Sequence, residues 1–427
     1  MRNIGIIILL VLCLTLLLLT GCMINTVTPG IDNGNLENQE DINQSSNNFQ
    51  SSSTGPVEEP VIEDTEEPAE EPAEEPGTVY PQKWATGDGT AENPWANDCI
   101  NSVHAACPTG GTVFLKAGYY ALDTLLAITK KINIIGEGIN KTIIVTSITD
   151  TIGIWTQTDY VTLKGFTLDC DSQGLGNWSG INIHNSDYVV IENVEVMNSG
   201  CVGINLYQVN HSTFQNIYAH DNYSHGLHPG SDTEGRNLYN TYRDIYAWDN
   251  GRLGFADRGN VNFIEPTGNV YDNLQCWDNA EMGIQIAYQQ DIVLSNSLAS
   301  GNGSQGIDFL GIEHSNINNC VSTLNGVTNS QQGVKLQDCK NVNLTNVIVT
   351  NNYTGTQLTD CSDIALTSCQ SYDDRDTPLQ RYGLQLNNTN AEISLLNCKI
   401  SPNALGDIYN PNGVVVTVIT EKMLAKF

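Results

Sequence analysis

Residues 180–197 have the sequence GINIHNSDYVVIENVEVM, and residues 203–219 repeat its pattern as GINLYQVNHSTFQNIYA. In both stretches a glycine precedes alternating apolar and polar residues, and an asparagine between apolar positions follows thirteen residues after the glycine. Alternation with a period of two is typical of β-strands, because successive side chains point to opposite faces. A strand pattern that returns at regular intervals indicates stacked coils.

The same two positions recur along most of the chain. The glycine recurs at Gly180, Gly203, Gly226, Gly254, Gly283, Gly306, Gly333, Gly355 and Gly383. The second position holds small polar residues, namely Asn193, Asn216, Asp244, Asn273, Asn296, Asn319, Asn346, Ser368 and Asn397. Neighbouring strands lie about 4.8 Å apart, so amides in such a column can hydrogen-bond along the stack. We therefore predict an all-β fold for residues 79–427, a single-stranded right-handed parallel β-helix (a solenoid) with coils of 22 to 29 residues.

The two ends of a solenoid need covering, because a terminal coil would otherwise expose its core. Apolar residues at helical spacing follow Asn97 or Asp98, which predicts an N-terminal capping helix over residues 97–107. Residues 401–427 depart from the repeat, and we expect them to cap the other end.

The chain contains 12 cysteines, of which Cys13 and Cys22 lie in the N-terminal segment and ten lie in the predicted β-helix. Most of these ten occupy small apolar positions of the repeat, so we interpret them as core residues. Cys339 and Cys361 stand one coil apart at the same register. They can be stacked or joined by a disulfide, and we favour stacking; the overall pairing cannot be deduced from spacing.

The N-terminus, MRNIGIIILLVLCLTLLLLTGC, combines Arg2 with an unbroken apolar run and has the character of an export signal. Its end, Leu-Thr-Gly-Cys, resembles the bacterial lipobox. The resemblance implies that residues 1–21 are a lipoprotein signal peptide and that Cys22 carries a diacyl lipid anchor, which would hold the protein stably on a membrane. We expect an exported, membrane-anchored lipoprotein on the cell surface or extracellular face.

Residues 22–78 form the second expected region, a lipid anchor followed by an acidic, Pro-rich linker that ends in EEPAEEPAEEPG. Few apolar residues and many carboxylates cannot offset the entropy lost on ordering, so we predict a disordered tether.

Charge limits the possible partners of the folded region. Without Arg2 and without the 14 acidic residues that precede Gly77, the chain has 34 acidic and 17 basic residues, a net charge of about −17. Such a surface opposes binding to nucleic acid. We expect a monomer whose partners are a polysaccharide, with uronic-acid polymers among the candidates, and the membrane that receives its anchor.

The repeat is interrupted in two adjacent coils. The distance from the glycine to the polar position is 18 residues from Gly226 to Asp244 and 19 from Gly254 to Asn273, against 13 in ordinary coils. This predicts two extra loops at one corner, at residues 230–240 and 258–268. Loops that leave a regular scaffold are where binding residues concentrate, so we place function at residues 225–268.

Unusual side chains lie next to these loops. Four of the seven histidines fall between His211 and His228, and four of the six arginines of the domain fall between Arg236 and Arg258. A histidine pair near neutral pKa can transfer protons, and cationic groups can bind a uronate carboxylate. The candidate catalytic residues are His225, His228, Asp257 and Arg258. The candidate substrate-binding residues are Arg236, Arg252, His220, Trp248, Trp277 and Asp232. The alternative interpretation is that these are solvated members of an outward ladder.

The succession GDGT, helix, GGTVFLKAG and INIIGEG resembles the N-terminal part of the pectate-lyase-like superfamily, and the resemblance covers roughly residues 80–400. More narrowly, HGLHPGSDTEGRNLYNTYRDIYAWDNGRLGFADRGN resembles the active-site stretch of mannuronan C5-epimerases, which carry YGFDPHE. The family's Tyr falls on His225, its Asp on His228, its His on Gly230 and its later Asp on Arg258, with Asp257 one place earlier. The scaffold letters match and the catalytic letters differ.

Three kinds of function follow from these residues. A lyase or epimerase would neutralise a uronate with Arg258, Arg236 or Arg252 and abstract a proton with His225 or His228. A glycoside hydrolase would need two carboxylates, for which Asp232, Glu234 and Asp257 are the candidates. The non-enzymatic alternative is a glycan-binding or adhesin-like surface solenoid.

We expect no certain cofactor. The two histidines with Asp232 or Asp257 could bind a divalent ion, but their spacing matches no dedicated zinc motif. Calcium could bridge the acidic protein and an acidic sugar.

Overall fold

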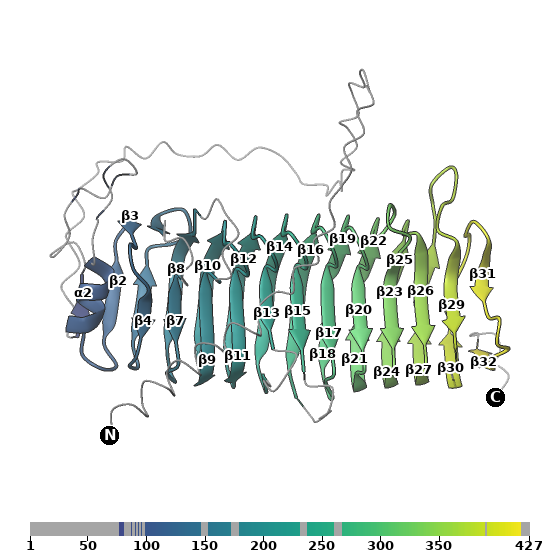
Figure 1. Ribbon diagram of the computed structural model, residues 1–427. Helices are drawn as coiled ribbons and strands as arrows, with labels where there is room; N and C mark the ends of the chain where they lie inside the picture. Colours follow the sequence, from purple (N-terminus) through teal and green to yellow (C-terminus); the bar gives the residue numbers. More distant parts are fainter. Residues whose placement is uncertain are drawn as a thin grey trace, which may run out of the picture. The chain divides into compact units, whose positions relative to one another are not determined.

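Strands stacked one above another make up nearly all of the structure, a computed structural model that describes residues 77–80, 87, 90, 93, 95, 99–146, 153–171, 179–230, 237–259, 267–388 and 391–419. These residues belong to the compact unit Pro76–Phe427. Every strand pairing among them is parallel. The predicted all-β parallel β-helix is therefore confirmed, and Figure 1 shows its coils as successive rungs.

One side of the β-helix is a twelve-stranded sheet, which will carry the candidate site. Each coil contributes one strand to this sheet. Its strands are β4 (Leu126–Ile128), β7 (Ile154–Thr156), β9 (Ile181–Asp187), β11 (Ile204–Asn210), β13 (Leu227–Pro229), β15 (Phe255–Arg258), β17 (Ile284–Ala287), β20 (Ile307–Leu310), β23 (Gln332–Gln337), β26 (Thr354–Thr359), β29 (Tyr382–Asn387) and β31 (Gly406–Tyr409).

The other sides form a twenty-stranded sheet. Its middle coils contribute single long strands, β8 (Thr162–Asp169), β10 (Val190–Met197), β12 (Thr213–His220), β14 (Thr241–Trp248) and β16 (Val270–Trp277). Later coils contribute two short strands each: β18 (Val293–Ser295) and β19 (Leu298–Ser300), β21 (Glu313–Asn318) and β22 (Val321–Thr323), β24 (Lys340–Thr345) and β25 (Ile348–Thr350), β27 (Ser362–Thr367) and β28 (Gln370–Tyr372). The remaining strands are β1 (Thr78–Val79), β2 (Thr112–Leu115), β3 (Gly118–Ala121), β5 (Asn133–Gly136), β6 (Thr142–Val145), β30 (Ala391–Leu396) and β32 (Val416–Ile419).

The predicted asparagine column lies at the corner where each long strand bends, or where two short strands meet. Its amides hydrogen-bond between coils, as from Asn216 Nδ2 to Asn193 Oδ1 at 2.8 Å and from Asn346 Nδ2 to Asn319 Oδ1 at 3.2 Å. All nine members also have a positive φ between 52° and 57°. Asparagine tolerates this left-handed conformation better than most residues. Two properties therefore favour asparagine in this column, the hydrogen bonding between coils and the positive φ. Only the hydrogen bonding was predicted from the sequence.

A second asparagine column is buried, and the sequence analysis missed it. Asn222, Asn250, Asn279, Asn302, Asn325 and Asn352 form it at the turn before the twelve-stranded sheet. The amides of all but Asn352 donate to the next member of the column, as from Asn279 Nδ2 to Asn302 Oδ1 at 2.9 Å and from Asn302 Nδ2 to Asn325 Oδ1 at 2.8 Å. The sequence signal was present, because four of these asparagines stand four residues before a repeat glycine.

Cysteines fill small positions of the core, as the sequence predicted. All ten described cysteines are free thiols, and all except Cys398 are buried. Cys339 and Cys361 are stacked on neighbouring coils without a disulfide between them.

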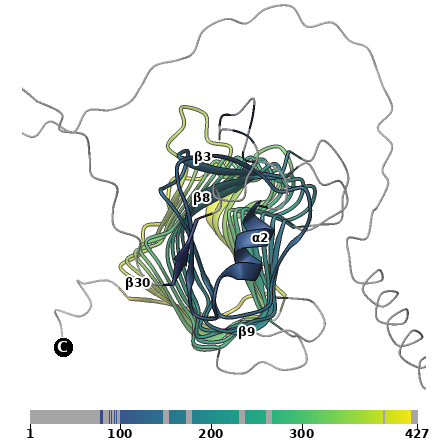
Figure 2. The ribbon, with the colours of Figure 1, turned by 90° about the vertical axis from the view of Figure 1, so that its left-hand side faces the viewer.

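The first described element after β1 is the helix α2 (Cys99–Ala106), whose residues Cys99, Ile100 and Val103 belong to the hydrophobic core. Figure 2 looks along the stack and shows α2 within the outline of the coils. At the other end, β31 and β32 pair in parallel with β29 and β30. Residues 401–419 therefore add another coil at the end that they were expected to cap, although their sequence departs from the repeat. Among the described residues, no helix has the length and apolarity needed to cross a membrane.

Candidate functional site

Three of the candidate catalytic residues lie on the neighbouring strands β13 and β15 of the twelve-stranded sheet, and His225 lies two residues before β13. Side chains alternate between the two faces of the strand that follows the repeat glycine Gly226. Leu227 therefore packs in the core, His228 points outward, and Pro229 points inward again. His228 pairs with Asn205 of β11, and Leu227 pairs with Phe255 of β15. Ala256 is therefore the outward neighbour of His228 on the next coil.

His225 and His228 contact each other edge to face, with ring centroids 4.9 Å apart. His225 is 6% exposed, and its Nδ1 lies 3.0 Å from Ser224 Oγ. Burial, then the neighbouring His228, Arg252 and Arg258, hold the pKa of His225 well below its ordinary value. Its ring is therefore neutral near pH 7. His228 is half-buried, with its Nδ1 3.2 Å from Asn205 Oδ1.

Ala256 lies opposite His228 on the next strand, and Arg258 lies two residues beyond Ala256 on that strand. Its Nε donates to Gln285 Oε1 at 2.7 Å, which fixes the guanidinium on the outward face of the sheet. Gly230, aligned with Arg258 on the preceding strand, is packed against it, since a Cβ there would meet the Arg258 carbonyl oxygen at 2.0 Å. The sheet therefore brings His225, His228 and Arg258 together, as the sequence predicted for these three.

Polar side chains continue along the same face beyond Arg258. Gln285 Nε2 donates to Asp308 Oδ2 at 2.8 Å, and Lys335 Nζ lies 3.7 Å from Asp308 Oδ1. On the other side of His228, Asn205 Nδ2 donates to Asn182 Oδ1 at 3.2 Å. We name this row the polar track; its members are Asn182, Asn205, His228, Arg258, Gln285, Asp308 and Lys335.

Asp257 does not belong to this face. Alternation in β15 turns its side chain into the core, where it is 1% exposed and pairs in register with Ile286. Tyr271 Oη donates to Asp257 Oδ2 at 2.7 Å. Burial raises the pKa of Asp257 to about 7, although its hydrogen bonds with Tyr271 and Gln289 act in the opposite direction. The sequence interpretation of Asp257 as an outward catalytic group is therefore corrected.

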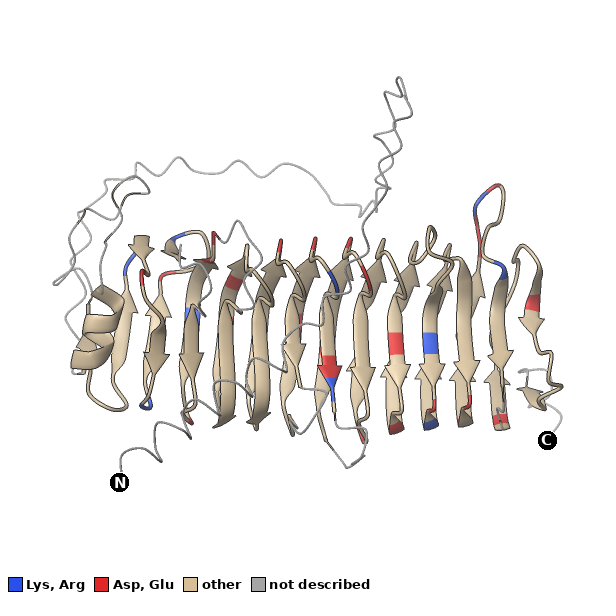
Figure 3. Ribbon diagram, viewed as in Figure 1, with Lys and Arg blue, Asp and Glu red and all other residues tan. Residues whose placement is uncertain are grey.

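Most other arginines of this region are paired with carboxylates. Arg252 Nε lies 3.2 Å from Glu281 Oε1. Arg243 lies on β14 in the other sheet, 3.5 Å from Asp272 Oδ2. The sequence count of arginines therefore overstated the positive charge near His228. Figure 3 shows charged residues as scattered segments on mostly uncharged strands.

The candidate aromatic residues form a stack on the twenty-stranded sheet. Trp248 and Trp277 lie parallel with centroids 4.9 Å apart, and His220 stacks on Trp248 at 4.1 Å. These three candidates therefore lie on successive coils of the other sheet. His220 Nδ1 lies 2.7 Å from Asp221 Oδ2 and Nε2 lies 3.4 Å from Glu195 Oε1. Burial lowers the pKa of His220, but these two carboxylates outweigh burial, and the pKa lies above its ordinary value.

The remaining candidates, Arg236, Asp232 and the anchor Cys22, lie outside the described residues. Within the described ranges, no group of three or more His, Cys, Asp or Glu residues is arranged to hold a metal ion.

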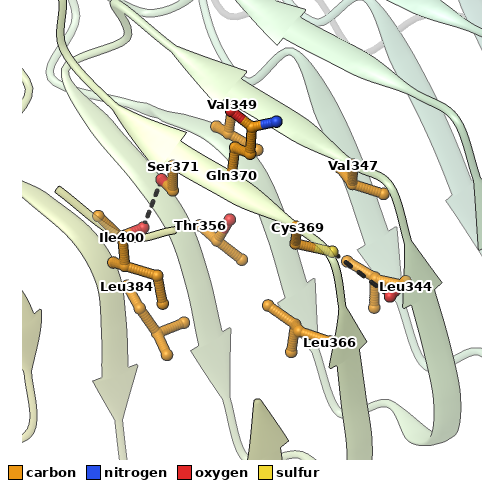
Figure 4. Close-up of a pocket in the computed structure, with 11 residues that line it drawn as sticks. Leu344, Val347, Val349, Thr356, Leu366, Cys369, Gln370, Ser371, Leu384 and Ile400 are labelled. Carbon is orange, nitrogen blue, oxygen red and sulfur yellow. Dashed lines mark hydrogen bonds between the residues drawn. The ribbon is translucent and has the colours of Figure 1, made fainter. Parts of the chain in front are cut away.

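A small cavity lies elsewhere, inside the C-terminal coils. Its volume is about 10 Å³, room for roughly one water molecule, and Leu344, Val347, Leu366, Leu384 and Ile400 are among its lining residues (Figure 4). It is far too small for a sugar, so the outward face of the twelve-stranded sheet is the better candidate site.

Five members of the polar track were not named as site candidates from the sequence: Asn182, Asn205, Gln285, Asp308 and Lys335. All five share one outward position of the repeat with His228, because each stands two residues after a repeat glycine. The register of the sheet confirms that they form one row with His228.

Comparison with protein families gives one match. The family model described as "Right handed beta helix region" matches residues 150–326 and 261–419, which together span more than half of the chain.

A curated relative is also similar. Mannuronan C5-epimerase AlgE3 of Azotobacter vinelandii is 26% identical over 234 residues, which cover 52% of this chain and 12% of the relative. The chain therefore matches only a small part of that relative's length.

Solved structures share the fold at low sequence identity. The A-module of Azotobacter vinelandii mannuronan C-5 epimerase AlgE6 has a TM-score of 0.59 at 17% identity, covering 80% of this chain and 98% of that chain. The AlgE4 A-module from the same organism has a TM-score of 0.54 at 19% identity, covering 79% and 99%. The Dettilon tailspike protein has a TM-score of 0.58 at 15% identity, covering 78% and 68%.

Proposed function

We propose that this chain acts on a uronic-acid polysaccharide at His228 and Arg258. The chain belongs to the right-handed β-helix family, whose parallel sheets present side chains in rows. The proposed reaction is abstraction of the proton at C5, next to the carboxylate. An epimerase would then return a proton to the opposite face, and a lyase would expel the group at C4.

The observation that carries this proposal is the placement of His228 and Arg258 on neighbouring strands of one face, with only Ala256 beside them on that row. A uronate needs two groups at a short separation, a cation for its carboxylate and a base for the adjacent proton. Ala256 is small but 0% exposed, so a sugar on this face would contact His228 and Arg258 rather than Ala256.

Each residue has a distinct part in this reaction. Arg258 neutralises the carboxylate, since guanidinium is the side chain best matched to a carboxylate. His228 takes the C5 proton onto its imidazole. His225, neutral near pH 7 and in contact with His228, positions that ring and avoids placing a second positive charge beside it.

The relatives support the substrate class. The matched relative and two of the structural neighbours are named mannuronan C5-epimerases, so a uronan substrate is in keeping with the comparisons. The differing letters at His225, His228, Gly230 and Arg258 mean that any reaction here uses its own catalytic groups.

Non-catalytic glycan binding is the second candidate function. The same four differences favour it, because a β-helix that has lost a catalytic set can keep its binding face. Hydrolysis ranks lower, because Asp257 lies in the core and Asp308 is the only carboxylate of the polar track.

We also propose that the protein is exported and held on a membrane through Cys22. The support is the lipobox-like sequence at residues 19–22. Radiolabelled fatty acid should be incorporated by the wild-type chain and not by Cys22→Ser; equal labelling of both would contradict the anchor.

The test of the proposed function is a comparison of His228→Ala with wild type on alginate, pectate and neutral glycans, with added calcium and with a chelator. Loss of the base should lower turnover by at least about a hundredfold. His314→Ala is the matched control, because His314 is exposed on β21 of the other sheet. Full activity in His228→Ala would reject the site, and binding without turnover by the wild type would favour the non-catalytic function.

A further inference from the structure

Asp308 has one carboxylate oxygen whose hydrogen bonding is incomplete. The residue is 3% exposed, and Oδ2 accepts the hydrogen bond from Gln285. Oδ1 is buried without a hydrogen-bond partner in the part of the chain that the structure describes. Lys335 Nζ, at 3.7 Å from Oδ1, forms an ion pair that is too long for a hydrogen bond.

A buried carboxylate oxygen in this state is unusual. Buried polar atoms in native proteins nearly always have a hydrogen-bond partner, and one that lacks it costs free energy. Asp308 is an outward residue of β20 on the polar track, and the Lys335 side chain beside it is 23% exposed. A rotation of the flexible lysine stem would open Oδ1 to a ligand on this face.

We propose that Asp308 and Lys335 form a separate subsite for one acidic sugar residue, an inference that rests on the proposed function. Asp308 Oδ1 accepts a hydrogen bond from a sugar hydroxyl, and the Lys335 ammonium binds the carboxylate of the same residue. The two side chains thereby fix the orientation of the sugar, because a carboxylate turned toward Asp308 would be repelled.

The subsite lies at a distance from the reacting position. His228 and Asp308 are three strand spacings apart along the sheet, about 14 Å. This exceeds the width of one sugar ring, so only an oligosaccharide can contact both. The polar track therefore binds an extended chain that lies along the axis of the β-helix, toward the C-terminal coils.

Chain-length dependence of binding tests this subsite. Calorimetric titration with uronic-acid oligosaccharides from two to eight residues would compare wild type with Lys335→Gln and with Asp308→Asn/Lys335→Gln. The double variant removes both charges, so it leaves no unpaired buried carboxylate if the single variant folds poorly. Both variants should bind the longest oligosaccharides about tenfold more weakly and bind disaccharides like wild type.

Lys340→Gln is the matched control, because it removes one exposed lysine from β24 of the other sheet. It should bind every length like wild type, and neutral oligosaccharides should not distinguish any of these proteins. Equal affinity of wild type and both Lys335 variants at every length would overturn the subsite while leaving the site at His228 intact. A wild type that binds no uronic-acid oligosaccharide would contradict both.

Discussion

Asp257 and Arg258 are neighbours in sequence, yet alternation in β15 sends one side chain into the core and the other onto the polar track. Sequence analysis located both residues and grouped them by proximity along the chain. Alternation counted from Gly254 assigns their faces, inward for Asp257 and outward for Arg258, but this count was not applied to Asp257. His225, His228 and Arg258 were predictable as a group, and Asp308 and Lys335 were predictable as outward residues in the column of His228. The ion pair between Asp308 and Lys335 and the burial of Asp308 were not, because they depend on side-chain conformation.

Burial of Asp257 predicts a pH-dependent stability. The folded-state pKa of Asp257 is about 7, against 3.8 for the ordinary carboxyl. Between these values the unfolded chain releases its proton and the folded chain retains it, so stability falls as pH rises. Asp257→Asn imitates the protonated side chain and should be more stable than wild type at pH 8, by on the order of 4 kcal/mol (about three pH units at 1.36 kcal/mol each).

Urea unfolding of both proteins at several pH values measures this effect. The difference between Asp257→Asn and wild type should shrink toward zero as pH falls below about 4, because both side chains are then neutral. A difference that stays constant from pH 4 to pH 8 would show that Asp257 does not carry a raised pKa.

At the scale of the strand and its corner, the two asparagine columns have different physical roles. The exposed column at the strand bends adopts positive φ and was predicted from its regular spacing. The buried column supplies hydrogen bonds to backbone groups at a turn, as when Asn302 Nδ2 donates to the Cys276 carbonyl at 3.0 Å. Four of its asparagines stand four residues before a repeat glycine, so their alignment could be read from the sequence, but their burial could not.

Alanine substitutions should separate these roles. Asn302→Ala leaves the Asn279 N–H and the Cys276 carbonyl without their partner, and should cost about 3 kcal/mol in the free energy of unfolding. Asn319→Ala, strained at φ 53°, should cost about 1 kcal/mol, and Asn319→Gly should cost less. Urea midpoints measured for the three variants test this order. A larger loss of stability in Asn319→Gly than in Asn302→Ala would refute it.

For the whole molecule, the sequence repeat was sufficient to predict a parallel β-helix, because each coil repeats the same strand alternation and polar corner. The extra coil formed by β31 and β32 was missed, because Ile419 stands thirteen residues after Gly406, where the ordinary coils carry a polar residue. Function is less determined by the repeat. It depends on a few outward residues, which the uniform scaffold brings into one row.

The polar track is the feature of the whole molecule on which the functional account depends. The most direct measurement is proton NMR of a polyuronate incubated with the wild-type protein in D₂O. Abstraction at C5 predicts loss of the C5 proton signal, through deuterium uptake in an epimerase or formation of an unsaturated sugar in a lyase, and retention of the signal with His228→Ala. The account would be contradicted if the wild-type protein bound alginate and pectate and the C5 proton signal of both were retained. Loss of the signal with His228→Ala at the wild-type rate would also contradict it.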